Sequence, residues 1–506
     1  MNLSDLIDRN AAFAPDKVAI RFEGRTLTYA GFAARIAQAA AALASQWRVG
    51  PGDHVAVLAT NHPDTLVLLY ACARLGALLV PVNWRLAVPE QLYILADASV
   101  KALVVEQAFA GIVAPLRQAD PAVHVAGLDF APDGGTTFDA FLLGASGAGR
   151  AASADFTAPL LIVYTSGTTG RPKGAVLRQD ALLANAAMSQ HLHDMTADDH
   201  VLTVLPIFHV GGLNIQTTPA LQLGATVTLH ARFAPGPTLE AIERERPTLT
   251  VLVPATIQAV IEHPRWPAAR LDCLRAVTTG STQVPQPLID AIADRGVPVL
   301  NVYGSTETCP IAVYARRGGD WRRPGSAGLP GLLCEARIVD DAGNEVAAGR
   351  AGEVVVRGNN VFTEYWRNPK ATAETLRDGW YHSGDIGTRD ADGYFTIHER
   401  KQNLIISGGE NIYPAEVERV LLTHPAVAEV AVVGAADAKW QEVPVACIVR
   451  RAGAEADPEE IEQFCLRELA RYKVPRRYVF LDDLPRNALG KVQHFRLKQQ
   501  IAAGGA

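Results

Sequence analysis

The segment YTSGTTGRPKG, from Tyr164 to Gly174, follows directly after the short apolar run Pro159 to Val163. Its glycines let the backbone turn N–H groups toward an anion, its hydroxyls can donate further hydrogen bonds, and its lysine adds a positive charge. It is not a Walker loop, because Pro172 precedes Lys173 and no Ser or Thr follows. A flexible linker has a similar composition, but the pattern suits a triphosphate. The candidate phosphate contacts are Thr165, Ser166, Gly167, Thr168, Thr169, Gly170 and Lys173.

Around this loop, alanine-rich helical periodicity alternates with short apolar runs, among them Val55 to Thr60, Ala102 to Gln107 and Ala225 to His230. That alternation predicts an α/β fold with layered, mainly parallel sheets. The segment Ala327 to Gly358 contains a turn-forming Asp-Ala-Gly-Asn between strand-like runs, which predicts a small β subdomain. Gly144 to Ala152 is typical of a surface connection.

A domain boundary is predicted near residue 400. Beyond it the pattern restarts with its own helix, Tyr413 to Pro425, and its own strand, Glu429 to Ala435. We therefore expect a large N-terminal domain over 1–400, a hinge at 401–403 and a mobile α+β C-terminal domain over 404–506.

Composition narrows the function. The chain has 506 residues and a net charge of -6, which argues against a nucleic-acid binder. Six scattered cysteines show no zinc spacing. The N-terminus has no secretory pattern, and the longest apolar stretch, Leu66 to Val82, is interrupted by Arg74 and Pro81. These features predict a soluble, cytoplasmic enzyme acting on small molecules.

The phosphate loop and a second segment, NVYGSTETCP from Asn301 to Pro310, resemble motifs of the adenylate-forming enzymes, the superfamily of acyl-CoA synthetases, luciferases and nonribosomal-peptide adenylation domains. The resemblance extends over essentially the whole chain. It implies that Tyr303 and Gly304 border the adenine, that Thr306 contacts phosphate, and that Glu307 binds Mg²⁺ together with Thr165. A hard cation that bridges phosphates usually takes one or two carboxylates. Taken alone, the segment would be a Tyr-Gly turn with a solvated glutamate.

Five further positions follow from the resemblance. Asp385, in YHSGDIG, and Arg400 are implied as ribose contacts, although such a glycine turn is often only structural. His209, in LPIFHVGGL, is implied to border the acyl carboxylate, where we assign it positioning rather than proton transfer. Gly280 and Ser281, in TTGSTQ, are implied to line the adenine and acyl pockets.

Two C-terminal motifs point to the two half-reactions. LPRNALGKVQ resembles the family's final motif, which implies that Lys491 bridges the attacking carboxylate and the α-phosphate. ISGGENIYPAEVE resembles the hairpin of CoA ligases that lines the pantetheine tunnel with Gly408 and Gly409. A solvated surface lysine and a plain helix-capping loop are the structural alternatives. The chain departs from the family at the hinge, where Gln402 and Asn403 replace charged residues.

These motifs together predict an AMP-forming acid–CoA ligase that uses ATP, Mg²⁺ and CoA. The segments expected near the acyl pocket, Val210 to Thr218, Thr278 to Gln283 and Thr308 to Val313, contain no charged residue, which favours a monocarboxylate. The run Pro81 to Leu86 resembles the fatty-acyl branch and favours a medium- or long-chain fatty acid.

Other interpretations stay open. The acid can instead be an aryl acid of the benzoate or cinnamate type. The enzyme can also be one that loads a carrier protein, or the chain a non-catalytic relative. The basic segment Arg471 to Phe480 suits a solvated face, CoA phosphates or a peripheral membrane contact. The sequence leaves the oligomeric state open, a homodimer included.

Overall fold

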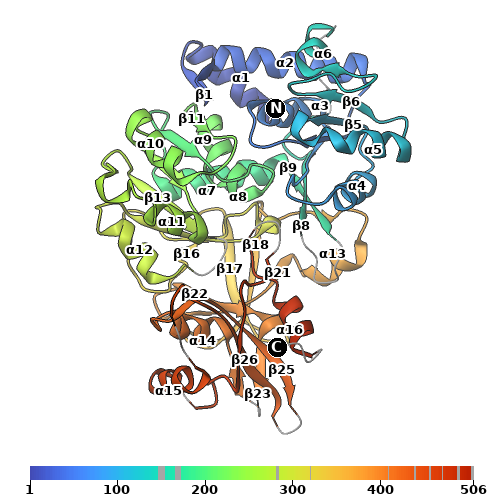
Figure 1. The fold of residues 1–506 in the computed structure, drawn as a ribbon. Helices are drawn as coiled ribbons and strands as arrows, with labels where there is room; N and C mark the ends of the chain where they lie inside the picture. Colours follow the sequence, from blue (N-terminus) through green and yellow to red (C-terminus); the bar gives the residue numbers. More distant parts are fainter. Residues whose placement is uncertain are drawn as a thin grey trace. The chain divides into compact units, whose positions relative to one another are not determined.

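The fold is known from a computed structural model. It describes residues 1–145, 154–165, 172–280, 284–319, 321–407, 410–437, 440–454, 457–469, 471–486 and 490–502, without the side chains of residues 399, 400, 402, 410 and 411. The described chain divides into two compact units (Figure 1). The first comprises residues 1–336 and 356–382, and the second 337–355 and 383–506.

The first unit contains a sheet in which the described residues form nine strands. Its six middle strands run parallel, and antiparallel strands lie at both edges. Short apolar runs flanked by helices explain the parallel pairing, because each crossover helix covers a face of the sheet. In sheet order the strands are β16 (Leu329–Pro330), β15 (Val313–Tyr314), β14 (Val299–Tyr303), β13 (Ala276–Gly280), β12 (Leu249–Val251), β10 (His200–Thr203), β11 (Thr226–Leu229), β1 (Val18–Phe22) and β2 (Arg25–Thr28).

A second sheet of the same unit has eight strands among the described residues. Six are parallel neighbours, whereas β9 pairs antiparallel with both β8 and β19. The predicted triphosphate loop therefore connects two antiparallel strands of an otherwise parallel sheet. In sheet order the strands are β19 (Glu364–Tyr365), β9 (Lys173–Arg178), β8 (Pro159–Thr165), β4 (Leu78–Pro81), β3 (His54–Leu58), β5 (Ala102–Val105), β6 (His124–Gly127) and β7 (Thr136–Thr137).

Helices pack on these sheets and on one another, as α1, α2 and α3 do in Figure 1. Helix α3 is enclosed almost completely, because every residue from Asp64 to Leu75 is buried. The apolar stretch Leu66 to Val82 is thus divided between α3 and β4. None of the helices in the described ranges is both long and apolar enough to cross a membrane. The α-helices of six or more residues in the described part of this unit are α1 (Leu3–Phe13), α2 (Tyr29–Gln46), α3 (Pro63–Leu75), α4 (Val88–Asp97), α5 (Val113–Ala119), α6 (Phe138–Leu143), α7 (Gln179–His193), α9 (Thr218–Leu223), α10 (Pro235–Glu245), α11 (Pro254–Ile261), α12 (Gln286–Ala293) and α13 (Pro369–Thr375).

A five-stranded sheet follows in the chain, and the division between the units falls within three of its strands, as far as the described residues show. Its order is β17 (Cys334–Val339), β18 (Gly352–Gly358), β21 (Trp380–Arg389) and β20 (Leu376–Arg377), with β22 (Phe395–Arg400) also paired to β21. The predicted turn between strand-like runs lies between β17 and β18, where the Asp340 backbone N–H donates to the Asn344 carbonyl over 2.9 Å.

The C-terminal part of the second unit contains a sheet with helices packed on both faces. Buried residues of α14 and α15, among them Val417 and Ile461, pack on one face, and Leu497 and Ile501 of α16 pack on the other. The described strands run in the order β24 (Glu410–Ile412), β23 (Ile405–Ser407), β26 (Gln441–Arg450), β25 (Val427–Asp437), with β27 (Arg477–Phe480) also on β26; the helices are α14 (Pro414–Leu421), α15 (Pro458–Glu468) and α16 (His494–Ala502).

The predicted α/β fold class is confirmed, and β3, β5 and β11 occupy the three apolar runs that suggested it. The predicted connection at 144–152 lies largely outside the described residues. The hinge expected at 401–403 is a single 3₁₀ turn, η5 (Lys401–Asn403), and its role in domain motion stays a prediction.

Candidate active site

The predicted triphosphate loop is anchored by a strand pair. Thr165, the last residue of β8, lies opposite Lys173, the first residue of β9. Gly174 is required there, because a Cβ on it would lie 2.6 Å from Cγ2 of Ile162. Five predicted loop contacts, Ser166, Gly167, Thr168, Thr169 and Gly170, lie outside the described residues. The structure therefore fixes the two ends of the loop.

A second part of the site lies at the carboxyl ends of the parallel strands β13 and β14. Gly280 pairs with Val302, next to Tyr303, so two segments far apart in the sequence end side by side. A Cβ on Gly280 would lie 2.3 Å from the Val302 carbonyl oxygen, which explains the glycine. Ligands of open α/β sheets bind at such carboxyl ends. The neighbouring candidate Ser281 lies outside the described residues.

The turn after β14 carries Glu307. Residues Thr306–Thr308 form a 3₁₀ helix, η4, in which the Ser305 backbone N–H donates to Thr308 Oγ1 over 2.9 Å. The chain folds back closely, because a Cβ on Gly304 would lie only 1.7 Å from the carbonyl oxygen of Pro310. Glu307 is thereby held in a rigid turn with 8% of its surface exposed.

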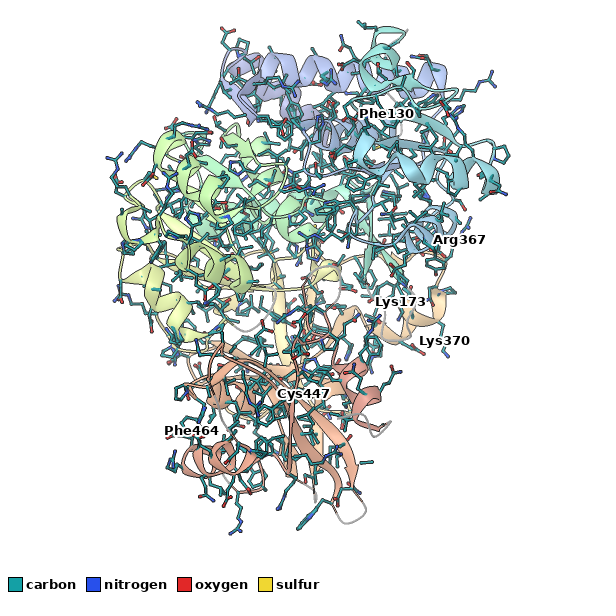
Figure 2. All side chains as sticks on the ribbon, viewed as in Figure 1. Phe130, Lys173, Arg367, Lys370, Cys447 and Phe464 are labelled. Carbon is teal, nitrogen blue, oxygen red and sulfur yellow. The ribbon has the colours of Figure 1, made fainter. Side chains whose placement is uncertain are left out.

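Two tyrosines that the sequence analysis did not select hold the Glu307 carboxylate. The Tyr365 hydroxyl donates to Oε1 over 2.7 Å, and the Tyr381 hydroxyl is 3.4 Å from Oε2. The Phe362 ring contacts both tyrosine rings, with centroid distances of 4.7 and 5.9 Å. Lys173, labelled in Figure 2, has its Nζ 5.3 Å from the centre of the Tyr365 ring. Tyr365 thus contacts residues of both predicted nucleotide motifs.

The environment of His209 fixes its protonation. Its Nδ1 accepts a hydrogen bond from the Gly211 backbone N–H over 3.0 Å, which assigns the proton of the neutral ring to Nε2. Burial lowers the pKa of His209 to about 4, although the charge of Glu307 acts in the opposite direction. The ring is therefore neutral near pH 7 and can donate one hydrogen bond through Nε2. This arrangement suits positioning rather than proton transfer.

The three segments expected near the acyl pocket come together around a π-helix, η2 (Leu213–Thr217). Gln216 Nε2 donates to Thr278 Oγ1 over 3.2 Å, and Asn214 Nδ2 donates to Cys309 Sγ over 3.5 Å. Asn214, Gln216 and Thr217 are at most 1% exposed. The contact region is thus buried and polar, yet its side chains carry no charge. The missing charge is visible in the sequence, whereas the burial of the Asn214 and Gln216 amides depends on contacts between distant segments.

In the second unit, Asp385 on β21 and Arg400 on β22 face each other as paired residues of an antiparallel ladder. The Asp385 carboxylate belongs to a residue that is 7% exposed. Gly384, with φ of 68°, gives its backbone N–H to Glu353 Oε1 over 3.0 Å. The two predicted ribose contacts are therefore neighbours in the fold, although the Arg400 side chain lies outside the described part.

The two C-terminal motifs belong to the second unit. Lys491 is exposed and follows Gly490, whose φ is 80° and whose carbonyl accepts from Arg486 Nη1 over 2.8 Å. Gly408 and Gly409 lie outside the described residues, between the paired strands β23 and β24.

Comparison with known proteins identifies the sequence family. Residues 7–366 match the family of AMP-binding enzymes, and residues 416–491 match the AMP-binding enzyme C-terminal domain. An indoleacetate–CoA ligase from Aromatoleum aromaticum is 49% identical over 99% of this chain and 98% of its own length. A feruloyl-CoA synthase from an Amycolatopsis species is 41% identical over 96% of each chain.

A solved structure agrees in fold. The o-succinylbenzoate–CoA synthetase of Bacillus subtilis, in complex with ATP and a magnesium ion, superposes with a TM-score of 0.87 and 32% identity. The match covers 98% of this chain and 99% of that one.

Proposed function

Because this chain belongs to the family of AMP-binding enzymes, we propose that it activates an aryl carboxylic acid with ATP and transfers the acyl group to CoA. A carboxylate oxygen attacks the α-phosphorus and displaces pyrophosphate. The CoA sulfur then attacks the acyl carbon and displaces AMP, while the thiol proton goes to solvent. The class of enzyme is an AMP-forming acid–thiol ligase that uses ATP, Mg²⁺ and CoA.

The similar proteins favour an aryl acid over the fatty acid that the sequence first suggested. The indoleacetate and feruloyl relatives are named for acids with aromatic rings. The fatty-acyl interpretation depended on Pro81 to Leu86, but Trp84 in that run packs against Phe109 and Phe208, with centroid distances of 5.9 and 6.4 Å. The contacts of Trp84 thus give this run a packing role, and the run lies outside the three acyl segments.

The observation that carries the proposal is the meeting of the acyl segments in one buried, uncharged region beside His209. An uncharged lining suits an aromatic ring and disfavours a second carboxylate, because a buried charge without a partner is costly. The neutral His209 supports this assignment, since its Nε2–H can orient the one carboxylate that reacts.

Glu307 and Thr165 are proposed to hold Mg²⁺. The donor set fits this cation, because the buried Glu307 carboxylate has two oxygens with lone pairs beyond those used by Tyr365 and Tyr381. When bound, Mg²⁺ supplies charge neutralisation on the phosphates. In this proposal Lys173 binds the terminal phosphates, and Tyr365 orients Glu307 toward the same region.

The second unit is proposed to supply the remaining contacts. Asp385 and Arg400 bind the ribose, and Lys491 neutralises charge where the carboxylate meets the α-phosphate. The hairpin with Gly408 and Gly409 guides the pantetheine arm in the second half-reaction. The exposure of Lys491 on a loop supports a contact that forms when the substrates are bound.

A panel assay tests this function. Pyrophosphate release is measured with arylacetic, cinnamic, benzoic and fatty acids, each with and without CoA. We expect turnover of aryl acids, CoA-dependent release of AMP, and weaker turnover of fatty acids. Preferential turnover of long-chain fatty acids would refute the aryl assignment, and AMP release without consumption of CoA would refute the ligase.

A further inference from the structure

Gln216 is a buried polar residue whose environment the reaction described above does not explain. It lies on η2 and is 1% exposed. Together with Gly212, Thr203 and Thr217 it lines a small cavity of about 10 Å³, which is at the lower limit for one water molecule.

The hydrogen bonds around His193 fix the orientation of the Gln216 amide. His193 Nδ1 is 2.7 Å from the Ser189 carbonyl oxygen, which can only accept, so Nδ1 carries the proton. Burial lowers the pKa of His193 to about 4, and its Nε2 is therefore an unprotonated acceptor. Gln216 Nε2 lies 3.0 Å from this His193 Nε2. If the amide were flipped, a lone pair of Gln216 Oε1 would face the lone pair of His193 Nε2. The amide nitrogen of Gln216 therefore faces His193.

The opposite end of the amide is consequently an acceptor. Gln216 Oε1 is buried and has no hydrogen-bond partner in the part of the chain that the structure describes. Buried acceptors normally have a partner in protein, water or ligand. The network of Ser189, His193 and Thr278 holds this oxygen in one orientation.

Gln216 also lies at the centre of the proposed acyl site. It contacts Thr278, two residues before Gly280, and belongs to the helix that follows His209. The cavity beside Gln216 has room for no more than a water-sized group, so the partner of this oxygen would be a single polar group and not a whole aromatic ring. A neutral donor suits the site, because the surrounding acyl segments hold no carboxylate to compensate a cation.

We propose that Gln216 is a specificity-determining residue whose Oε1 accepts a hydrogen bond from a neutral N–H or O–H group on the ring of the aryl acid. The inference rests on the proposed function and narrows it to aryl acids that carry a ring donor. A site with an oriented acceptor rejects an analogue without the donor, because the acceptor then stays unpaired.

The test compares acids that differ in this donor alone: indole-3-acetate with benzofuran-3-acetate, 4-hydroxycinnamate with 4-methylcinnamate, and 2-aminobenzoate with 2-methylbenzoate. In wild-type protein we expect at least one donor acid to exceed its partner by roughly tenfold or more in kcat/KM. Gln216→Met, which keeps the chain length and removes the acceptor, should reduce that ratio to within about threefold, through loss on the donor acid alone.

Gln222→Met is the matched control, because Gln222 is also a buried glutamine but lies outside the three acyl segments. It should leave the ratio unchanged. Equal turnover of both acids in every pair by wild-type protein overturns the inference and leaves the aryl ligase intact, even if Gln216→Met does not fold. An equal loss on both acids in Gln216→Met also overturns it. Failure to turn over any aryl acid while fatty acids react overturns the proposed function as well.

Discussion

Tyr365→Phe provides a direct test of how the carboxylate of Glu307 is held. The substitution deletes the hydroxyl that donates to Glu307 Oε1 over 2.7 Å. It keeps the ring, and with it the contacts to Phe362 and Lys173. The change therefore removes a hydrogen bond to a charged group while the aromatic ring stays in place.

The expected size of the effect follows from burial. Glu307 is 8% exposed, so water replaces the lost donor poorly. A hydrogen bond to a charged group contributes about 1.5–3 kcal/mol. If that energy orients the carboxylate for the cation and phosphates, the rate of adenylation at limiting Mg²⁺ falls by about 10- to 150-fold, at 1.36 kcal/mol per factor of ten.

The assay is exchange of labelled pyrophosphate into ATP, measured over a range of Mg²⁺ concentrations. We expect Tyr365→Phe to raise the Mg²⁺ concentration needed for half-maximal exchange, with saturating Mg²⁺ restoring part of the rate. Tyr381→Phe is the control, because its hydroxyl lies 3.4 Å from Oε2 and also contacts Ser305 Oγ at 2.9 Å. An unchanged Mg²⁺ dependence in Tyr365→Phe, or a larger effect in Tyr381→Phe, would refute the reasoning.

Three further predictions concern a turn, a buried histidine and the C-terminal lysine. Gly304→Ala places a Cβ 1.7 Å from the Pro310 carbonyl oxygen, so it should destabilise the fold by about 1–3 kcal/mol and abolish pyrophosphate exchange. Gly318→Ala is the control, because a Cβ there has no atom within 4 Å, and it should change neither thermal unfolding nor exchange. Burial lowers the pKa of His193 to about 4, so the unfolded chain binds the extra proton first and stability falls as pH decreases below 6.5. From this group, the free energy of unfolding in urea should be about 2 kcal/mol lower at pH 5 than at pH 7, and His193→Gln should lack this loss. The same dependence of unfolding free energy on pH in both proteins would contradict the prediction. Lys491→Ala should slow adenylation by about 10²–10³-fold, while conversion of a supplied acyl-adenylate to the thioester continues; a normal adenylation rate would exclude the proposed role.

The sequence predicted those parts of the fold whose signal is local. β3 and β5 are short, mainly apolar runs, and β11 alternates threonine with valine and leucine; such β-branched and apolar runs are typical of buried strands. Thr165 and Lys173 delimit the loop because the glycines and proline between them end one strand before the next begins. Gly304 and Gly280 likewise stand where another backbone segment passes too close for a side chain.

Features made by long-range contacts were not predictable in this way. Tyr365 belongs to a two-residue strand, too short to leave a periodic signal, and pairing of β19 with β9 brings it beside Lys173. The bond from Tyr365 to Glu307 joins residues from distant motifs. The orientation of Gln216 depends on Ser189 and His193 of α7 and on Thr278 of β13, two elements far apart in the sequence.

The antiparallel pairing of β8 with β9 has a consequence for nucleotide affinity. Because Thr165 and Lys173 are ladder partners, the ends of the seven-residue segment 166–172 are brought together when the protein folds. The conformational entropy of closing that segment is therefore lost during folding and not during association with ATP. If the pairing of β8 with β9 were disrupted at Thr165 and Lys173, the segment would have to be closed when ATP binds. ATP would then bind more weakly, although no direct contact to it had been removed.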